Sequence, residues 1–153
     1  MVRAAIALGS NLGDREAALG RAAVQLAARL GGIAVSDFIE TQPEGVGEQP
    51  AFLNAAVTGD WDGDARSLLA LLTDIERAAG RERPYPGAPR TLDLDLVLFG
   101  AAIIDEPGLV VPHPRFRERG FVLVPLEQIA PDLVDPVSGL TVAELLRSWR
   151  EAY

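Results

Sequence analysis

The chain has 153 residues, 48% of them hydrophobic and 24% charged, so it fits one globular domain, 1–153, long enough to bury a core of its own. It contains no cysteine and a single histidine, which excludes disulfides and thiolate metal sites and leaves oxygen atoms as the ligands of any metal. The net charge of −8 argues against bulk nucleic-acid binding, and the lack of a long apolar run or a signal-peptide pattern predicts a cytoplasmic protein without a membrane segment.

The first half of the chain alternates between strand-like and helix-like stretches. Apolar residues recur at strand or helix spacing in segments bounded by glycine, proline and aspartate. We expect strands at 2–8, 33–41 and 52–58, and helices at 15–30 and 68–79. Asp14 is placed to cap the first helix and Gly80 to end the second. The segments 42–50 and 81–89, rich in proline and glycine, are predicted loops.

The second half predicts one more sheet strand and a helical C-terminal extension. We expect a strand at 91–99, a hairpin at 101–104 and 109–111 that extends the sheet, a helical turn at 115–119 and a helix at 122–129. Thr141 and Glu144 form a capping box that opens a last helix. The order β-α-β-β-α-β predicts an α+β, ferredoxin-like fold, in which helices pack on a mostly antiparallel sheet.

The most informative stretch is the strand at 91–99. Side chains two apart on a strand point the same way, so Asp93 and Asp95 share one face and the leucines between and beside them share the other. Two neighbouring carboxylates favour a cation between them, and Mg²⁺ binds through one or two carboxylates, water and substrate phosphates. The alternative is a solvated strand end that carries a surface ion pair, and the local pattern does not decide between the two.

The basic residues are concentrated in one part of an acidic chain. All 14 are arginines, and six of them fall between residues 81 and 119. These six are Arg81, Arg83, Arg90, Arg115, Arg117 and Arg119. Guanidinium groups bind phosphate oxygens with a fork of donors, so this local positive charge predicts a site for a small polyanion such as a nucleoside triphosphate.

With these elements placed, motifs along nearly the whole chain carry a resemblance to a known family. They are ALGSNLG at 7–13, QP at 49–50, FLNA at 52–55, IE at 75–76, GR at 80–81, PRTLDLD at 89–95, VPH at 111–113 and RGF at 119–121. Each motif is weak alone, but their order and spacing are specific. The sequence resembles the 6-hydroxymethyl-7,8-dihydropterin pyrophosphokinases of folate biosynthesis.

The resemblance implies transfer of diphosphate from ATP to the pterin hydroxymethyl group, with release of AMP. By resemblance, Asp93 and Asp95 hold two Mg²⁺ ions, and Arg90 and Arg81 act with them as catalytic residues on the ATP phosphates. The implied partners are therefore small molecules, ATP and the pterin, without nucleic acid or membrane, and we expect a monomer.

The resemblance also assigns a pterin site. A pterin is a flat heteroaromatic ring with a polar edge, which needs stacking faces and amide-like hydrogen bonds. Phe52 and Phe121 match the two stacking positions, Asn54 the ring edge, and Thr41 and Gln42 positions whose backbone groups complete that edge. Without the resemblance, each phenylalanine reads as core and the asparagine as a residue bonded to backbone.

A second set of positions matches the nucleotide site. These positions are Glu76, Arg83, Leu96, His113 and Arg119. The histidine is assigned a phosphate or leaving-group contact and no general-base role. The competing interpretations are a solvent-facing helical glutamate, surface ion pairs for the arginines, and a rigid turn residue for a histidine between two prolines.

The chain departs from the family between Arg83 and Pro89. Gly87 stands where the family carries a tryptophan, and the segment is shorter and uncharged. We expect Tyr85 to replace part of the lost aromatic cover over ATP. The departure keeps open a catalytically silent pterin-binding homologue, and the aspartate pair keeps open a metal-dependent nuclease or another phosphotransferase.

Overall fold

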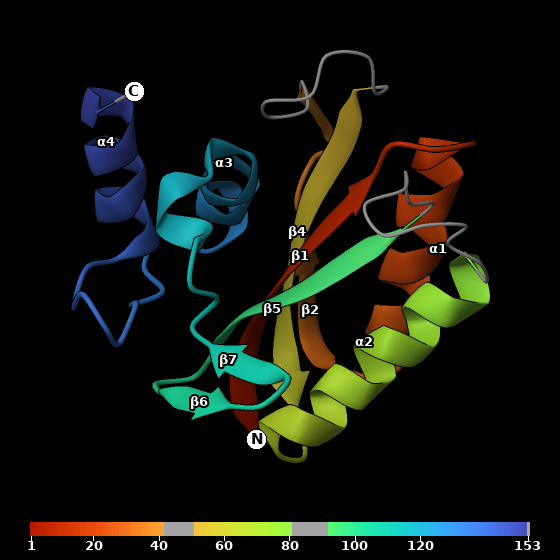
Figure 1. Ribbon diagram of the computed structural model, residues 1–153, viewed down its shortest axis with the longest axis horizontal. Coiled ribbons are helices and arrows are strands. Elements are labelled where there is room, and N and C mark those ends of the chain that lie inside the picture. The colour runs from red at the N-terminus through yellow and green to blue at the C-terminus, as the bar shows by residue number, and fades with distance from the viewer. Residues whose placement is uncertain (42–50, 81–91, 153) are drawn as a thin grey trace.

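The centre of the molecule is a five-stranded antiparallel sheet (Figure 1). The computed structural model describes residues 1–41, 51–80 and 92–152. The sheet strands are β1 (Val2–Ser10), β2 (Gly31–Val35), β3 (Ile39–Thr41), β4 (Phe52–Trp61) and β5 (Asp93–Phe99). Their order is β2-β4-β1-β5, with β3 also paired to β4, and every one of these pairs is antiparallel.

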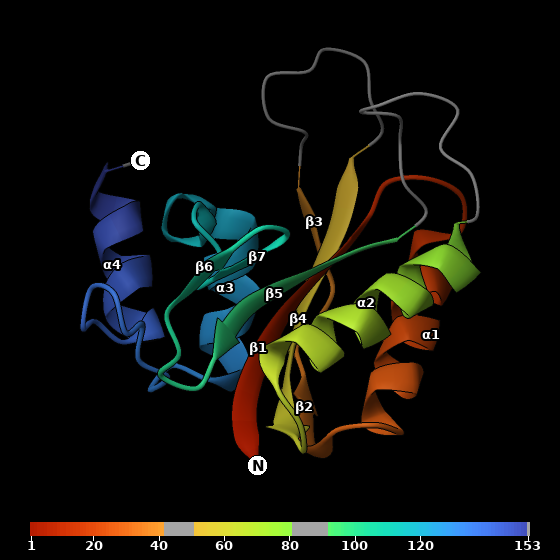
Figure 2. The same ribbon diagram turned by 60° about the horizontal axis from the view of Figure 1, so that its bottom comes forward.

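Helices cover both faces of this sheet. The helices are α1 (Arg15–Ala27), α2 (Ala65–Ala79), α3 (Gly120–Ile129) and α4 (Val142–Ala152). The first two lie on one face and α3 on the other, and α4 packs outside α3 (Figures 1 and 2). With β2 and β3 taken as one interrupted strand, the predicted ferredoxin-like α+β fold with a C-terminal helical extension is confirmed.

Strand alternation divides the buried side chains into two cores. Along β1, Ile6 and Leu8 face α1 and α2, whereas Ala5 faces α3. Along β4, Val57 belongs to the first core and Ala56 to the second. The α3 side of the sheet carries the pocket described below.

The predicted helix caps are present. The Asp14 side chain accepts a hydrogen bond from Ala17 N (3.1 Å) at the start of α1. At the start of α4, Thr141 N donates to Glu144 Oε1 (3.0 Å) and Glu144 N donates to Thr141 Oγ1 (3.1 Å). No helix in the described ranges is long and apolar enough to cross a membrane.

The prediction of one strand at 33–41 is wrong, because the chain leaves the ladder at Ser36. The buried Ser36 hydroxyl takes the place of a backbone group and accepts from Ala56 N (2.8 Å). The next N–H, of Asp37, turns away to Gln128 Oε1 on α3 (2.7 Å). The strand is therefore split into β2 and β3, and α3 is tied to the bend between them.

The hairpin also differs from the prediction. The strands β6 (Ile104–Glu106) and β7 (Leu109–Val111) pair only with each other and form a separate two-stranded sheet. Gly100, at φ +55°, and the bond from Ala102 N to Phe99 O turn the chain away from β5 before it can pair. The first helix likewise ends at Ala27 rather than at the predicted residue 30.

Candidate active site

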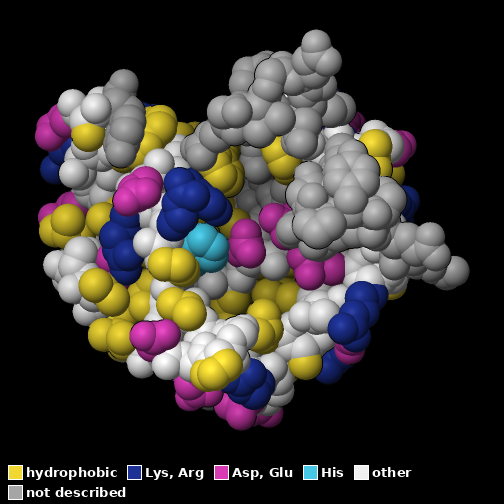
Figure 3. Space-filling view, in the orientation of Figure 1, with side chains coloured by type: hydrophobic (Ala, Val, Ile, Leu, Met, Phe, Trp, Pro, Cys, Tyr) yellow, Lys and Arg dark blue, Asp and Glu magenta, His cyan; other side chains and the backbone are white. Residues whose placement is uncertain are grey.

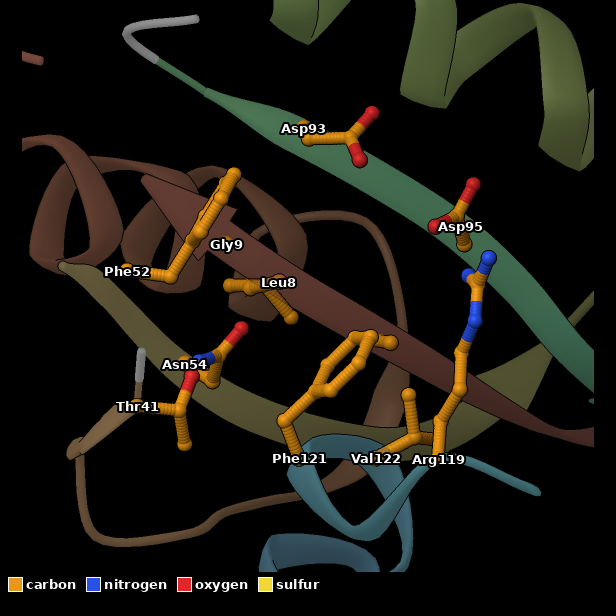
Figure 4. Close-up of a pocket in the computed structure, with 11 residues that line it drawn as sticks. Leu8, Gly9, Thr41, Phe52, Asn54, Asp93, Asp95, Arg119, Phe121 and Val122 are labelled. Carbon is orange, nitrogen blue, oxygen red and sulfur yellow. Dashed lines mark hydrogen bonds between the residues drawn. The ribbon is translucent and has the colours of Figure 1, made fainter. Parts of the chain in front are cut away.

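A pocket of about 230 Å³ opens at one end of the sheet, on the α3 side (Figure 4). Its walls come from the end of β1, the end of β3, the starts of β4 and β5, and the first residues of α3. The lining residues are Ala7, Leu8, Gly9, Thr41, Phe52, Asn54, Asp93, Asp95, Arg119, Phe121 and Val122. Seven of the sequence-predicted site residues therefore meet in one cavity, although they are far apart in the chain.

The acidic wall is the start of β5. Asp93 and Asp95 both line the pocket and are partly buried, whereas Leu94 is buried in the core beneath α1 and α2. The predicted shared face of the two aspartates is thus present. Leu96 is also a core side chain and lies outside the lining, so its predicted contact with nucleotide stays a prediction.

A third carboxyl group lies against the base of this wall. Glu76 on α2 accepts a hydrogen bond from Leu94 N through Oε2 (2.8 Å). Burial, with a smaller contribution from the neighbouring Asp93 and Asp95, raises the pKa of Glu76 to about 7, against the hydrogen bond from Leu94 N, which lowers it. Burial and the neighbouring carboxylates therefore both favour a proton on Glu76 near neutral pH. The predicted position of Glu76 beside the nucleotide stays a prediction.

The basic wall lies opposite, at the junction of the 3₁₀-helix η1 (Phe116–Glu118) with α3. Arg119 stacks over the Phe121 ring at 5.5 Å and extends toward Asp95 on β5 (Figure 4). Its Nε is buried and has no hydrogen-bond partner among the described residues. A buried guanidinium donor without a partner, at the edge of a cavity, is suited to an anionic or carbonyl oxygen of a ligand.

The histidine lies beside this basic wall. His113 N donates to Val97 O (2.9 Å) and His113 Nδ1 accepts from Arg115 N (3.2 Å), so its neutral ring carries the proton on Nε2. Burial lowers the pKa of His113, and Arg119 and Arg115 lower it further, against Asp93. Arginine side chains flank it on one side and acidic side chains on the other (Figure 3).

The remaining walls form a narrow slot. Asn54, which is buried, donates from Nδ2 to Thr41 Oγ1 (2.6 Å), while Phe52 and Phe121 enter the pocket from β4 and α3 (Figure 4). Sequence reasoning did not assign Gly9 to the site. A Cβ at that position would lie 3.2 Å from Asn54 Oδ1, so glycine keeps the slot open. The GSN motif that ends β1 was the available signal.

Four predicted site residues cannot be placed. Gln42, Arg81, Arg83 and Arg90 lie outside the described residues, as does Tyr85. The described part contains no group of three or more His, Cys, Asp or Glu side chains arranged to hold a metal ion. Any cation at Asp93 and Asp95 therefore takes two described protein carboxylates and completes its shell elsewhere.

The fold and the pocket define a class of α+β proteins in which a carboxylate pair and an arginine face a small-molecule slot. The family model described as 7,8-dihydro-6-hydroxymethylpterin-pyrophosphokinase (HPPK) matches residues 5–131. The chain belongs to this family. It is accordingly a transferase, a pyrophosphokinase of folate biosynthesis.

Individual relatives agree with this membership. The chain is 45% identical over 148 residues to the 2-amino-4-hydroxy-6-hydroxymethyldihydropteridine pyrophosphokinase of Methylorubrum extorquens, covering 95% of this chain and 92% of the relative. It is 42% identical over 150 residues to the Bacillus subtilis protein of the same name, covering 95% and 89%.

Solved structures share the fold. The HPPK-DHPS of Plasmodium falciparum superposes with a TM-score of 0.79 at 16% identity, over 97% of this chain and 45% of that one. The chain thus spans less than half the length of that protein, and the likeness concerns the fold alone.

Proposed function

We propose that this enzyme transfers the diphosphate of ATP to 6-hydroxymethyl-7,8-dihydropterin, with Mg²⁺, and releases AMP. The observation that carries the proposal is the convergence of two carboxylates, one arginine and two aromatic rings on a single pocket. Family membership agrees with it, since the named relatives are pyrophosphokinases of this pterin. The hydroxymethyl oxygen forms the new bond to the β-phosphorus and gives up its proton to solvent. The bond between that phosphorus and the α,β-bridging oxygen breaks, and this oxygen leaves with AMP.

The carboxylate pair fits magnesium. Asp93 and Asp95 offer only oxygen ligands from one strand face, and both carboxylates line the same pocket. We propose that the two aspartates hold two Mg²⁺ ions. When bound, Mg²⁺ neutralises the charge on the transferred phosphates and orients the attacking hydroxyl.

The slot fits a flat heterocycle. Phe52 and Phe121 supply the stacking faces. Asn54 Nδ2 is already bonded to Thr41 Oγ1, which fixes the amide and leaves Oδ1 to accept from the amino edge of the ring. These residues orient the pterin so that its hydroxymethyl group lies toward the aspartates.

Arg119 and His113 are the described groups suited to phosphate. Arg119 Nε, which has no partner within residues 1–41, 51–80 and 92–152, is a ready donor, and neutral His113 offers a second donor at Nε2. We assign both to charge stabilisation and positioning, with no general base. The roles of Arg81, Arg83, Arg90, Gln42, Glu76 and Leu96 remain those predicted from the sequence.

The test is AMP formation from ATP and the pterin, with and without Mg²⁺, in wild type, Asp95→Asn and Asp105→Asn. Asp105 is exposed on β6 and serves as the matched control. We expect Mg²⁺-dependent AMP release in wild type and control, and a fall of at least about a hundredfold in Asp95→Asn. Pterin binding without AMP release in folded wild type would instead identify a silent homologue, and nucleic-acid cleavage with Mg²⁺ alone would identify a nuclease.

We further propose that residues 1–153 act as one domain and as a monomer. The described walls of the pocket come from four strands and one helix of a single chain, which supports this proposal. Light scattering at the concentration of the activity assay tests it, and a dimer mass would refute it.

A further inference from the structure

The segment that carries Arg119 and Phe121 into the pocket has little regular structure of its own. It consists of the three-residue η1 and the first turn of α3. Two backbone bonds, from Glu118 N to Arg115 O and from Arg119 N to Phe116 O, hold η1 together at 3.1 and 3.2 Å. A helix of one turn is not stable alone, so contacts from elsewhere must fix its position.

The first such contact comes from Asp135, in the loop between α3 and α4. Asp135 is fully buried and accepts from Arg117 Nε and Nη2 at 2.5 and 2.9 Å. The Ser138 hydroxyl (2.6 Å) and Val137 N (3.0 Å) also donate to it. This fork-to-carboxylate pairing fixes the direction of Arg117, two residues before Arg119.

The second contact comes from Trp149 on α4. Its ring fills the space where residue 120 would carry a Cβ, so that a side chain there would overlap it. Trp149 Nε1 also donates to Glu118 O (3.2 Å). Gly120 lies between Arg119 and Phe121 in the chain. Trp149 therefore packs against the backbone from which the Arg119 and Phe121 side chains enter the pocket.

We propose that Asp135 and Trp149 are positioning residues of the active site: Asp135 through Arg117, and Trp149 through Gly120 and Glu118, fix the segment that presents Arg119 and Phe121. This inference deepens the proposed function and rests on it. Neither residue lines the pocket. A displacement of about 1 Å at a reacting centre can cost up to about a hundredfold in rate, so the geometry of this remote pair matters to turnover.

The chain provides matched controls for both residues. Asp60 pairs with Arg3 (3.4 Å), and Trp61 donates from Nε1 to Asp64 O (3.0 Å), as Asp135 and Trp149 do with their partners. Asp60 and Trp61 lie at the C-terminal end of β4, whereas the pocket residue Phe52 lies at its N-terminal end. Asp60→Asn removes one carboxylate from a partly exposed arginine pair, Trp61→Leu removes a buried ring and its hydrogen bond, and neither change touches η1.

The experiment compares Asp135→Asn and Trp149→Leu with these two controls at a temperature where circular dichroism shows every variant folded. In Asp135→Asn and Trp149→Leu we expect the KM for the pterin and the KM for ATP to rise about tenfold and kcat to fall. In the two controls both KM values should stay within about twofold of wild type. Trp149→Phe keeps a ring over Gly120 and should retain KM values within about threefold of wild type.

The inference is overturned if Asp135→Asn and Trp149→Leu lose stability but keep wild-type KM and kcat, because the two residues would then be purely structural. Calorimetric pterin binding gives a second readout that does not need turnover. If wild type releases no AMP, the proposed function fails, whereas a tenfold weaker pterin Kd in the same two variants would still support the positioning role. Unchanged Kd values would refute it.

Discussion

Acidification is expected to lower the free energy of unfolding by protonating the buried carboxylate of Asp135. Burial by itself raises the pKa of this carboxyl, but hydrogen bonds from Arg117, Ser138 and Val137 outweigh it and lower the pKa from 3.8 to about 2. A carboxyl with a lower pKa in the folded state stabilises the fold above its unfolded pKa. This contribution is lost as the pH falls through the folded pKa.

The size of the effect follows from the shift. Nearly two pKa units correspond to about 2 kcal/mol, present in full above about pH 5 and lost on the way to about pH 2. Near neutral pH, Asp135→Asn should cost about 3 kcal/mol, because Arg117 keeps its charge in a mostly buried site without a carboxylate partner.

Urea unfolding of wild type and Asp135→Asn between about pH 7 and about pH 2.5 measures both quantities. The difference in unfolding free energy between the two proteins should shrink by about 1.5 kcal/mol over this range, because the folded carboxyl is only partly protonated at about pH 2.5. A difference that stays constant with pH would show that Asp135 titrates alike in the folded and unfolded states, and would refute the reasoning.

Three further predictions concern the slot and the helices. Gly9→Ala places a methyl group 3.2 Å from Asn54 Oδ1 and should raise the KM for the pterin several-fold. The control Gly20→Ala, which has open space around it on α1, should leave the kinetics unchanged and raise the free energy of unfolding by about 0.5–1 kcal/mol. Equal KM values in the two variants would contradict the role of Gly9 in the slot. Phe52→Leu removes a stacking face and should weaken pterin binding by about 1 kcal/mol in calorimetry while leaving ATP binding unchanged, a selectivity that a general folding defect would not produce. Thr141→Ala breaks the capping box of α4 and should lower the free energy of unfolding by about 1 kcal/mol, and an unchanged urea midpoint would show that the box does not stabilise the helix.

Local patterns were enough for the order of elements and for the acidic wall. Asp93 and Asp95 share the pocket face because alternation along a strand is a property of the backbone, whatever packs on it. Strand 33–41 was predicted in one piece because nothing in its own sequence shows that the Ser36 hydroxyl, and not a backbone carbonyl, would accept from Ala56 N of β4. At the next residue Asp37 N donates to Gln128, on a helix 91 residues further along the chain, and a local pattern carries no sign of this bond.

The sequence by itself determined the β-α-β-β-α-β order, the helix caps and the carboxylate pair, because each depends on residues within a few positions of one another. The tertiary structure decided what faces that pair. It placed Arg119 opposite Asp95 and brought Gly9 close to Asn54. It also brought the C-terminal extension behind the pocket. Contacts between segments far apart in the chain leave no periodic trace in either one, since their free energy comes from shape and burial that exist only once the layers have packed.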